Sequence, residues 1–239
     1  MACPAGTLYR NYFAPVKISG SENLQYGQSE AFQINNLDEL EIALGNQNFW
    51  QIKNDYTFSE ISKLKALGDL LKRKSVSEID QLRDVIKVGV QQNVGVVFNS
   101  NEYEVPSTDE IEKARVTQVY CSAISCGYSR VDNIYWEPLA RLVLEAAYEA
   151  TLWSALACPP AESPVTPSPS SNRVVFLTFL GGGVFQNDMD WILQAMARSL
   201  WKLRKAGAHL QVKIYHYRRI DEDVVRRLDY FYRQYQLGG

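Results

Sequence analysis

The chain has 239 residues, of which 46% are hydrophobic, so it is long and apolar enough to bury a core as one large domain. Its formal net charge is −2 and it has no long run of Lys or Arg, which excludes tight electrostatic binding to a nucleic-acid backbone. The longest apolar segment, residues 139–158, carries Arg141, Glu145 and Glu149, and these charges exclude a membrane span. We therefore predict a single α/β domain over residues 1–239.

The N-terminal residues 1–27 are polar and interrupted by Gly and Ser, a composition that predicts an arm at the start of the domain. No basic segment followed by a long apolar core is visible there, so we expect no secretory signal and an intracellular, cytoplasmic protein. The cysteines form no paired C-x-x-C pattern, so we expect neither a metal site nor a cofactor. They are Cys3, Cys121, Cys126 and Cys158.

In the front half, hydrophobic alternation predicts short strands at residues 32–34 and 49–52, separated by a helical turn over residues 37–43. Two helices follow. Ser59 is placed to cap the first, and Ser77 with Asp80 forms a capping signature for the second, whose apolar positions extend to residue 90. A further short strand is expected at residues 94–98.

In the middle of the chain, residues 116–124 predict a strand that ends in a glycine-containing loop. A long amphipathic helix is expected from Glu137, with Pro138 in its first turn, where a missing amide does no harm. Residues 158–172 are crowded with Pro and Ser and predict an exposed, flexible loop that is dispensable for chemistry.

The most informative segment begins at residue 174, where seven apolar or β-forming residues predict a strand buried on both faces. Gly181, Gly182 and Gly183 follow, and then Asn187 is placed to cap an amphipathic helix that extends to residue 203. Backbone amides at such a strand-to-helix turn can hold an anionic oxygen. A glycine triplet also serves as a plain tight turn, and this alternative stays open.

Near the C-terminus, apolar and polar residues alternate strictly over residues 210–217, which predicts a strand with one buried face. Residues 221–236 predict a terminal helix with an acidic start.

Three segments together resemble a macrodomain, the ADP-ribose-binding fold. Residues 174–188, VVFLTFLGGGVFQND, look like the family strand and its pyrophosphate loop, residues 210–227 like its last strand and helix, and residues 116–127 like the strand before them. The resemblance implies a three-layer α/β/α domain with a mixed central sheet. Gln186, Asn187 and Asp188 depart from the family loop, where glycine, an aromatic residue and proline are usual, and the front half lacks the Asn-Ala-Ala-Asn motif.

The Tyr-Glu-Ala-Thr-Leu sequence at residues 148–152 and the Cys-Ser-Ala sequence at residues 121–123 look closest to the divergent, MavL-like group of macrodomains. Members of that group remove ADP-ribose from modified proteins. The resemblance therefore implies an ADP-ribosyl hydrolase that cleaves a glycosidic bond, with ADP-ribose or an ADP-ribosylated protein as its partner. A reader that binds ADP-ribose without cleaving it is the alternative, and a scaffold with a decayed site is a third reading.

By this resemblance the ligand-binding residues are Asn36, Asn54, Ser122, Gly127, Gly181, Gly182, Gly183, Val184, Phe185 and Asn187. Glycosidic cleavage passes through an oxocarbenium-like state and needs a carboxylate near the reacting carbon, for which we select Asp55, Asp188 and Asp190. Asp132 is a further acid expected near the site. Asp188 and Asp190 also suit the first turn of a helix, and Asp55 suits an Asx turn, so structural roles are open alternatives.

Overall fold

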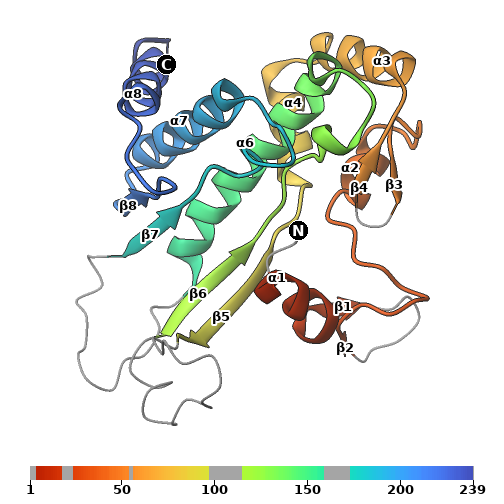
Figure 1. Cartoon of the computed structure of the whole chain (residues 1–239), viewed down its shortest axis with the longest axis horizontal. Helices are drawn as coiled ribbons and strands as arrows, with labels where there is room; N and C mark the ends of the chain where they lie inside the picture. The colour runs from red at the N-terminus through yellow and green to blue at the C-terminus, as the bar shows by residue number, and fades with distance from the viewer. Residues whose placement is uncertain (1–3, 18–23, 54–55, 97–114, 159–172, 239) are drawn as a thin grey trace.

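The computed structural model describes residues 4–17, 24–53, 56–96, 115–158 and 173–238, and it has the mixed α/β composition that the sequence predicts (Figure 1). The first elements are α1 Pro4–Leu8, the π-helix η1 Tyr9–Phe13, β1 Pro15–Lys17, β2 Leu24–Tyr26, α2 Asp38–Ala43, β3 Gln51–Lys53 and β4 Tyr56–Phe58. Then come α3 Ile61–Lys72, α4 Val76–Asp84, β5 Gly89–Gly95, β6 Arg115–Tyr120, the 3₁₀ turn η2 Cys126–Tyr128 and α6 Asn133–Ala157. The chain closes with β7 Val174–Leu177, α7 Met189–Lys205, β8 Gln211–Ile214 and α8 Glu222–Gly238.

The described strands form four two-stranded sheets instead of the single mixed sheet expected between two helical layers. β1–β2, β3–β4 and β5–β6 are antiparallel, and β7–β8 is parallel. In Figure 1 the helix α6 lies between the β5–β6 and β7–β8 pairs. β7 is also shorter than predicted and is not buried on both faces, because Val174 and Phe176 are 40% and 52% exposed while its other two residues are buried.

The hydrophobic core is built on α6 and α7. Trp136, Leu139 and Leu144 of α6 and Ile192 and Met196 of α7 are all completely buried. α6 begins one turn earlier than predicted, because the Asp132 side chain accepts the Ile134 N–H and caps the helix there. Pro138 is therefore inside the helix and not in its first turn.

Several front-half expectations are wrong, and local hydrogen bonds give the reason. Residues 32–34 are irregular, and β3 starts only at residue 51. The Ser59 hydroxyl donates to the Phe49 carbonyl at 2.5 Å and does not cap α3. α4 is capped by Ser75 and Glu78 in a reciprocal capping box, not by Ser77. α4 ends at Asp84 and not near residue 90 as predicted, and β5 begins at Gly89.

An ionic cluster joins α4, α6 and α7. Arg198 of α7, which is 7% exposed, donates to Glu149 of α6 and to Asp80 of α4, both at 2.5 Å. Burial opposes ionisation of Glu149, but hydrogen bonds from Lys202 and Arg198 outweigh it and hold its pKa below the ordinary value. Since burying Arg198 without its acids would be costly, the cluster fixes α4 and α7 on α6.

The two ends of the predicted Pro/Ser-rich loop meet at the end of α6. Cys158, predicted as part of that exposed loop, is buried and forms the C-cap of α6, while residues 159–172 lie outside the described residues. The Arg173 guanidinium, just before β7, donates to the carbonyl oxygens of Ala155 and Cys158 at 2.7 and 3.0 Å. A cation at a helix C-terminus satisfies unpaired carbonyls, so this contact closes α6 onto β7.

The N-terminal segment contacts the β5–β6 pair through Tyr9 of η1, while β2 pairs with β1. The ring of Tyr9 stacks on Tyr120 with centroids 4.9 Å apart, and its hydroxyl donates to the Val90 carbonyl at 3.3 Å. Among the described helices, none combines the length and apolar character needed to cross a bilayer.

Candidate functional site

Residues 178–188, called the glycine turn below, join β7 to α7 at the carboxyl end of the parallel β7–β8 pair. Tyr148 of α6 holds the start of this turn: its hydroxyl donates to the Thr178 carbonyl at 2.7 Å and accepts the Leu180 N–H at 2.8 Å. Burial raises the pKa of Tyr148 far above its ordinary value, so the hydroxyl keeps its proton. In open α/β sheets, ligands bind beside such strand ends.

The Asn187 side chain holds the inside of the turn together. Its amide Nδ2 donates to the Ile124 carbonyl at 2.8 Å and lies 3.4 Å from the carbonyls of Gly181 and Phe185. Asn187 is only 5% exposed, so its side chain lies within the turn and not on a ligand-facing surface. The predicted cap of α7 was therefore wrong by one residue, because Asp188 supplies it by accepting the Asp190 N–H at 2.7 Å.

Two contacts fix the far side of the turn. The Gly127 N–H donates to the Phe185 carbonyl at 3.0 Å, and the Asn133 side-chain amide donates to the Gln186 carbonyl at 2.6 Å. Gln186 has a φ of 55°, in the left-handed region that glycine usually occupies. η2 and the start of α6 therefore hold the turn from outside.

Different surroundings explain the glycines of the turn and the neighbouring Gly127 of η2. A Cβ on Gly181, whose φ is +75°, would lie 2.4 Å from the Ala123 Cβ, and a Cβ on Gly127 would lie 2.5 Å from the Val184 carbonyl oxygen. Packing alone explains both. A Cβ on Gly183 would meet nothing within 4 Å, so packing within the described part of the chain does not explain that glycine.

The exposed rim of the turn, Gly182 to Val184, presents backbone to solvent. Val184 is 63% exposed, and the N–H groups of Gly183 and Val184 have no acceptor within the described ranges. Gly182 donates to the Phe179 carbonyl at 3.2 Å. Unpaired amides at a strand-to-helix turn are the donor set that an anionic oxygen uses.

Three aromatic rings stand beside this rim. The rings of Tyr56 and Tyr128 stack with centroids 4.4 Å apart, and Phe185 meets them edge-on at 6.3 and 5.8 Å. Phe185 was predicted to line the site, whereas Tyr56 was not selected. Its only sequence signal was its place directly after Asn54 and Asp55, which lie outside the described residues.

A polar groove of about 490 Å³ lies next to the turn. Its lining residues are Cys126, Gly127, Ser129, Arg130, Val131, Asp132, Asn133 and Gln186. Arg130 and Asp132 give it one charge of each sign. The sequence placed Asp132 near the site, but Arg130 was missed, because nothing in its spacing distinguishes it from a solvated loop residue.

The other predicted site residues have the following places. Asp188 caps α7, and Asp190 is paired with Arg227 of α8 through an Nη2–Oδ1 distance of 2.5 Å. Ser122 is exposed and its hydroxyl donates to the Ala123 carbonyl at 3.1 Å, two residues before Ile124. Asn36 lies before α2 and its carbonyl accepts the Lys87 N–H, so none of its described contacts joins it to the glycine turn.

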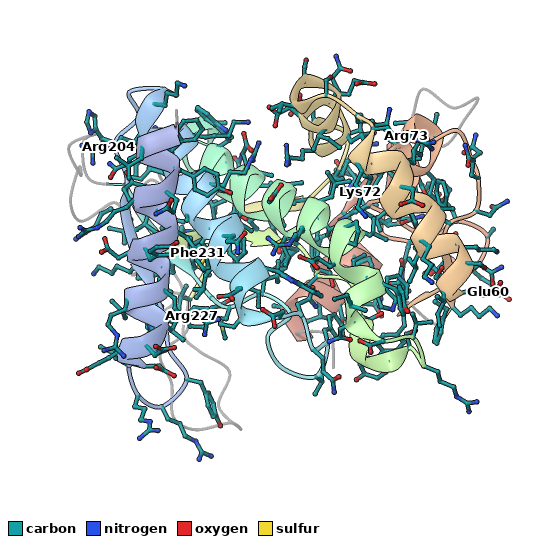
Figure 2. All side chains as sticks on the ribbon, turned by 90° about the horizontal axis from the view of Figure 1, so that it is seen from above. Glu60, Lys72, Arg73, Arg204, Arg227 and Phe231 are labelled. Atoms are coloured by element: carbon teal, nitrogen blue, oxygen red, sulfur yellow. The ribbon has the colours of Figure 1, made fainter. Side chains whose placement is uncertain are left out.

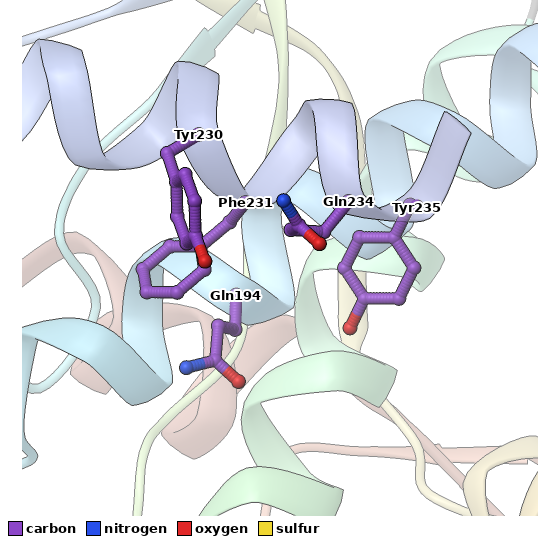
Figure 3. A pocket seen from close by; sticks show the side chains of 5 residues that line it. All are labelled: Gln194, Tyr230, Phe231, Gln234 and Tyr235. Carbon is purple, nitrogen blue, oxygen red and sulfur yellow. The ribbon is translucent and has the colours of Figure 1, made fainter. Parts of the chain in front are cut away.

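A second hollow, of about 340 Å³, lies between α7 and α8 (Figure 3). Its lining residues are Gln194, Tyr230, Phe231, Gln234 and Tyr235. Figure 3 shows the rings of Tyr230 and Phe231 side by side near Gln194, whose Oε1 accepts a hydrogen bond from Arg141 at 2.7 Å. Its ionisable groups are the phenols of Tyr230 and Tyr235, and burial raises the pKa of Tyr235 above its ordinary value, so that phenol keeps its proton at neutral pH.

Within the described part of the chain, no cluster of His, Cys, Asp and Glu could hold a metal ion. Burial raises the pKa of Cys126 to about 12, so this thiol in the groove is not a ready nucleophile. A comparison of the chain with family models, curated proteins and solved structures gave no match. The glycine turn and its surroundings are therefore the features of the molecule that bear on its function.

Proposed function

We propose that the protein binds the ADP-ribosyl group of a modified protein, with the diphosphate on the Gly182–Val184 rim, and hydrolyses the glycosidic bond to the protein. One observation carries this proposal: the glycine turn is anchored on its inner and outer sides, yet Gly183 is open and its N–H is unpaired among the described residues. A rigid turn with free amides binds an oxyanion without first losing conformational freedom.

The three aromatic rings beside the rim and the polar groove can contact the parts of an ADP-ribosyl group other than its diphosphate. Phe185, next to the rim, can cover a ribose or a base, since aromatic faces stack on both. The polar groove, which begins at Gly127 and Gln186, offers hydrogen-bonding groups for hydroxyls. Asp132 is the described acid that lines this groove. Its Oδ1 accepts the Ile134 N–H and caps α6, so its other carboxylate oxygen is the one that can orient water toward an oxocarbenium-like centre.

Calorimetric titration with ADP-ribose tests the binding step. We expect Gly183→Glu to weaken binding by at least about 100-fold, because a carboxylate would stand where the diphosphate charge is held. Gly238→Glu is the matched control, since a Cβ there also meets nothing within 4 Å. Thermal midpoints should match wild type for both variants. Equal ADP-ribose affinity in both variants would end the proposal.

Release of ADP-ribose from an ADP-ribosylated protein tests the hydrolytic step. We expect Asp132→Asn to lower the rate by about 100-fold or more, the usual contribution of acid–base catalysis. Asp55→Asn, Asp188→Asn and Asp190→Asn complete the set of candidate carboxylates. Turnover that survives in all four variants would reject carboxylate-assisted hydrolysis.

A reader that binds without cleaving is the second candidate, and a specific observation favours it. Asp132 and Asp188 both cap helices and Asp190 is in an ion pair, so each candidate carboxylate that the structure describes is already engaged. Tight ADP-ribose binding together with no release of product over a long incubation would establish this alternative.

A further inference from the structure

The outer face of the β7–β8 pair exposes apolar and aromatic side chains. Val175 and Leu177 of β7 are buried in the core, whereas Val174 and Phe176, which alternate with them, are exposed. Tyr215, which directly follows β8, is 58% exposed, and the centroid of its ring lies 5.5 Å from that of Phe176. Adjoining exposed apolar side chains on a folded protein mark an interaction surface.

Three cations accompany these rings. Lys213 of β8 stands opposite Phe176 in the register of the two strands, with its Nζ 5.9 Å from the centre of the Phe176 ring. Further along the chain, the Arg218 Cζ lies 5.0 Å from the centre of the Tyr217 ring, and Arg219 follows. Among the described residues, no carboxylate forms an ion pair with any of the three. The aromatic–basic strip, as it is called below, consists of Phe176, Lys213, Tyr215, Tyr217, Arg218 and Arg219.

The loop after β8 is anchored from its inner side by His216. The His216 ring meets Phe179 edge-on with centroids 5.0 Å apart, and its Nδ1 accepts the Asp221 N–H at 3.3 Å. Arg218 has a φ of 65°, a left-handed backbone that costs free energy in a residue with a Cβ. Tyr217, which is 83% exposed, therefore projects from a held backbone.

The charges of the strip favour an acidic protein segment as its partner. Two copies of this chain packed strip to strip would bring Lys213, Arg218 and Arg219 against the same three cations. Asp221 and Glu222 follow the strip and are exposed, so a broad anionic bilayer would meet them as well. A narrow extended segment along β8 avoids both acids.

We propose that the aromatic–basic strip docks an extended acidic segment of a partner protein. Carboxylates of that segment pair with Lys213 and Arg218, and its apolar side chains cover the rings of Phe176 and Tyr215. Such pairing selects the partner by charge and makes the affinity depend on salt. The inference does not depend on the proposed function, because the strip contains none of the residues proposed to hold ADP-ribose.

Fluorescence anisotropy with the whole chain and a labelled peptide that alternates glutamate with valine tests this docking. We expect Lys213→Glu to weaken binding about fivefold to tenfold, because an attraction becomes a repulsion. Phe176→Ala should weaken it about threefold, since the apolar cover is lost. Lys213→Arg should bind as wild type does, because the charge remains. Wild-type affinity should fall at 1 M salt, where the screening length is about 3 Å.

Lys65→Glu is the matched control. Lys65 of α3 is another exposed lysine over an aromatic ring, with its Nζ 5.3 Å from the centre of the Tyr135 ring, and its reversal changes the net charge equally. Figure 2 labels Glu60 and Lys72 at the two ends of α3, on the opposite side of the molecule from α8, and Figure 1 likewise separates α3 from β8. Its affinity for the acidic peptide should equal that of wild type.

Several results would overturn the inference. Equal affinity of Lys213→Glu and Lys65→Glu is one, and another is a wild-type protein that does not bind the acidic peptide or binds its glutamine counterpart equally well. Tighter binding of polyuridylate or of phosphatidylserine vesicles would assign the strip to a nucleic acid or a membrane instead. A wild-type dimer that Phe176→Ala dissociates in sedimentation would assign it to a second copy. ADP-ribose affinity should be the same in every strip variant, so a failure of ADP-ribose to bind bears only on the proposed function.

Discussion

Gly181 and Gly183 are two residues apart in one turn, yet they lie in opposite environments. Gly181 is enclosed by Ala123 and Asn187, and its positive φ requires glycine. Gly183 is enclosed by nothing within the described ranges. The inner part of the turn is thus built for rigidity and the rim for access, a division that a glycine triplet alone does not reveal.

Gly181→Ala should have the largest effect on stability. The new Cβ would clash with Ala123 and force a left-handed backbone on alanine, so we expect a loss of about 2 to 4 kcal/mol in the free energy of unfolding. Urea denaturation followed by far-UV circular dichroism measures it. A loss under about 0.5 kcal/mol, the range of neutral surface changes, would show that the turn is not packed as described.

Asn187→Ala should come next, with a loss of about 2 kcal/mol, because the buried carbonyl of Ile124 would have no donor. Asn187→Asp sharpens the comparison, since a carboxylate would place only acceptors against that carbonyl and should be worse at neutral pH than at pH 4. The same urea titration at both pH values checks this. Equal stability of the Asp variant at both pH values would contradict a buried, carbonyl-facing side chain.

Tyr148→Phe should cost about 1 kcal/mol, because the bridge to Thr178 and Leu180 is lost. The wild-type protein should also lose stability as the pH rises above 10. The sign follows from the raised pKa: the unfolded chain releases the Tyr148 proton first, so alkaline pH favours unfolding. Thermal midpoints between pH 8 and 11 measure this slope, which should be smaller in Tyr148→Phe.

Gly183→Ala should have the smallest effect, within about 0.5 kcal/mol of wild type, because its Cβ would project into open space. Differential scanning fluorimetry beside Gly181→Ala gives the direct contrast. Comparable losses of stability in the two variants would contradict the distinction between a packed inner turn and an open rim.

The sequence predicted the strand–turn–helix segment and the helices around it, because strong helical periodicity and glycine punctuation are local signals. It missed the cap of α7 by one residue, since Asn187 and Asp188 are both good caps and only the nearby Ile124 carbonyl decides between them. It also expected one mixed sheet, but strand pairing depends on distant segments, and these strands are short.

Much of the candidate site could not be read from the sequence. Three separate segments of the sequence supply the rings of Tyr56, Tyr128 and Phe185, and no local sequence pattern indicates that these rings are in contact. The partner of Asp190 is equally distant, because Arg227 lies on the last helix. Periodicity reports the face of an element that is buried, but it does not report which side chains the fold brings together.

The hydrogen bonds from Arg173 to the end of α6 have a practical consequence. Because its guanidinium ties β7 to the Ala155 and Cys158 carbonyls, the two points between which residues 159–172 run are already held together without that connection. A reporter domain could be spliced into this stretch, or new chain ends created there, with little loss of the surrounding architecture. Such a fusion would carry a label on the protein while leaving the glycine turn untouched.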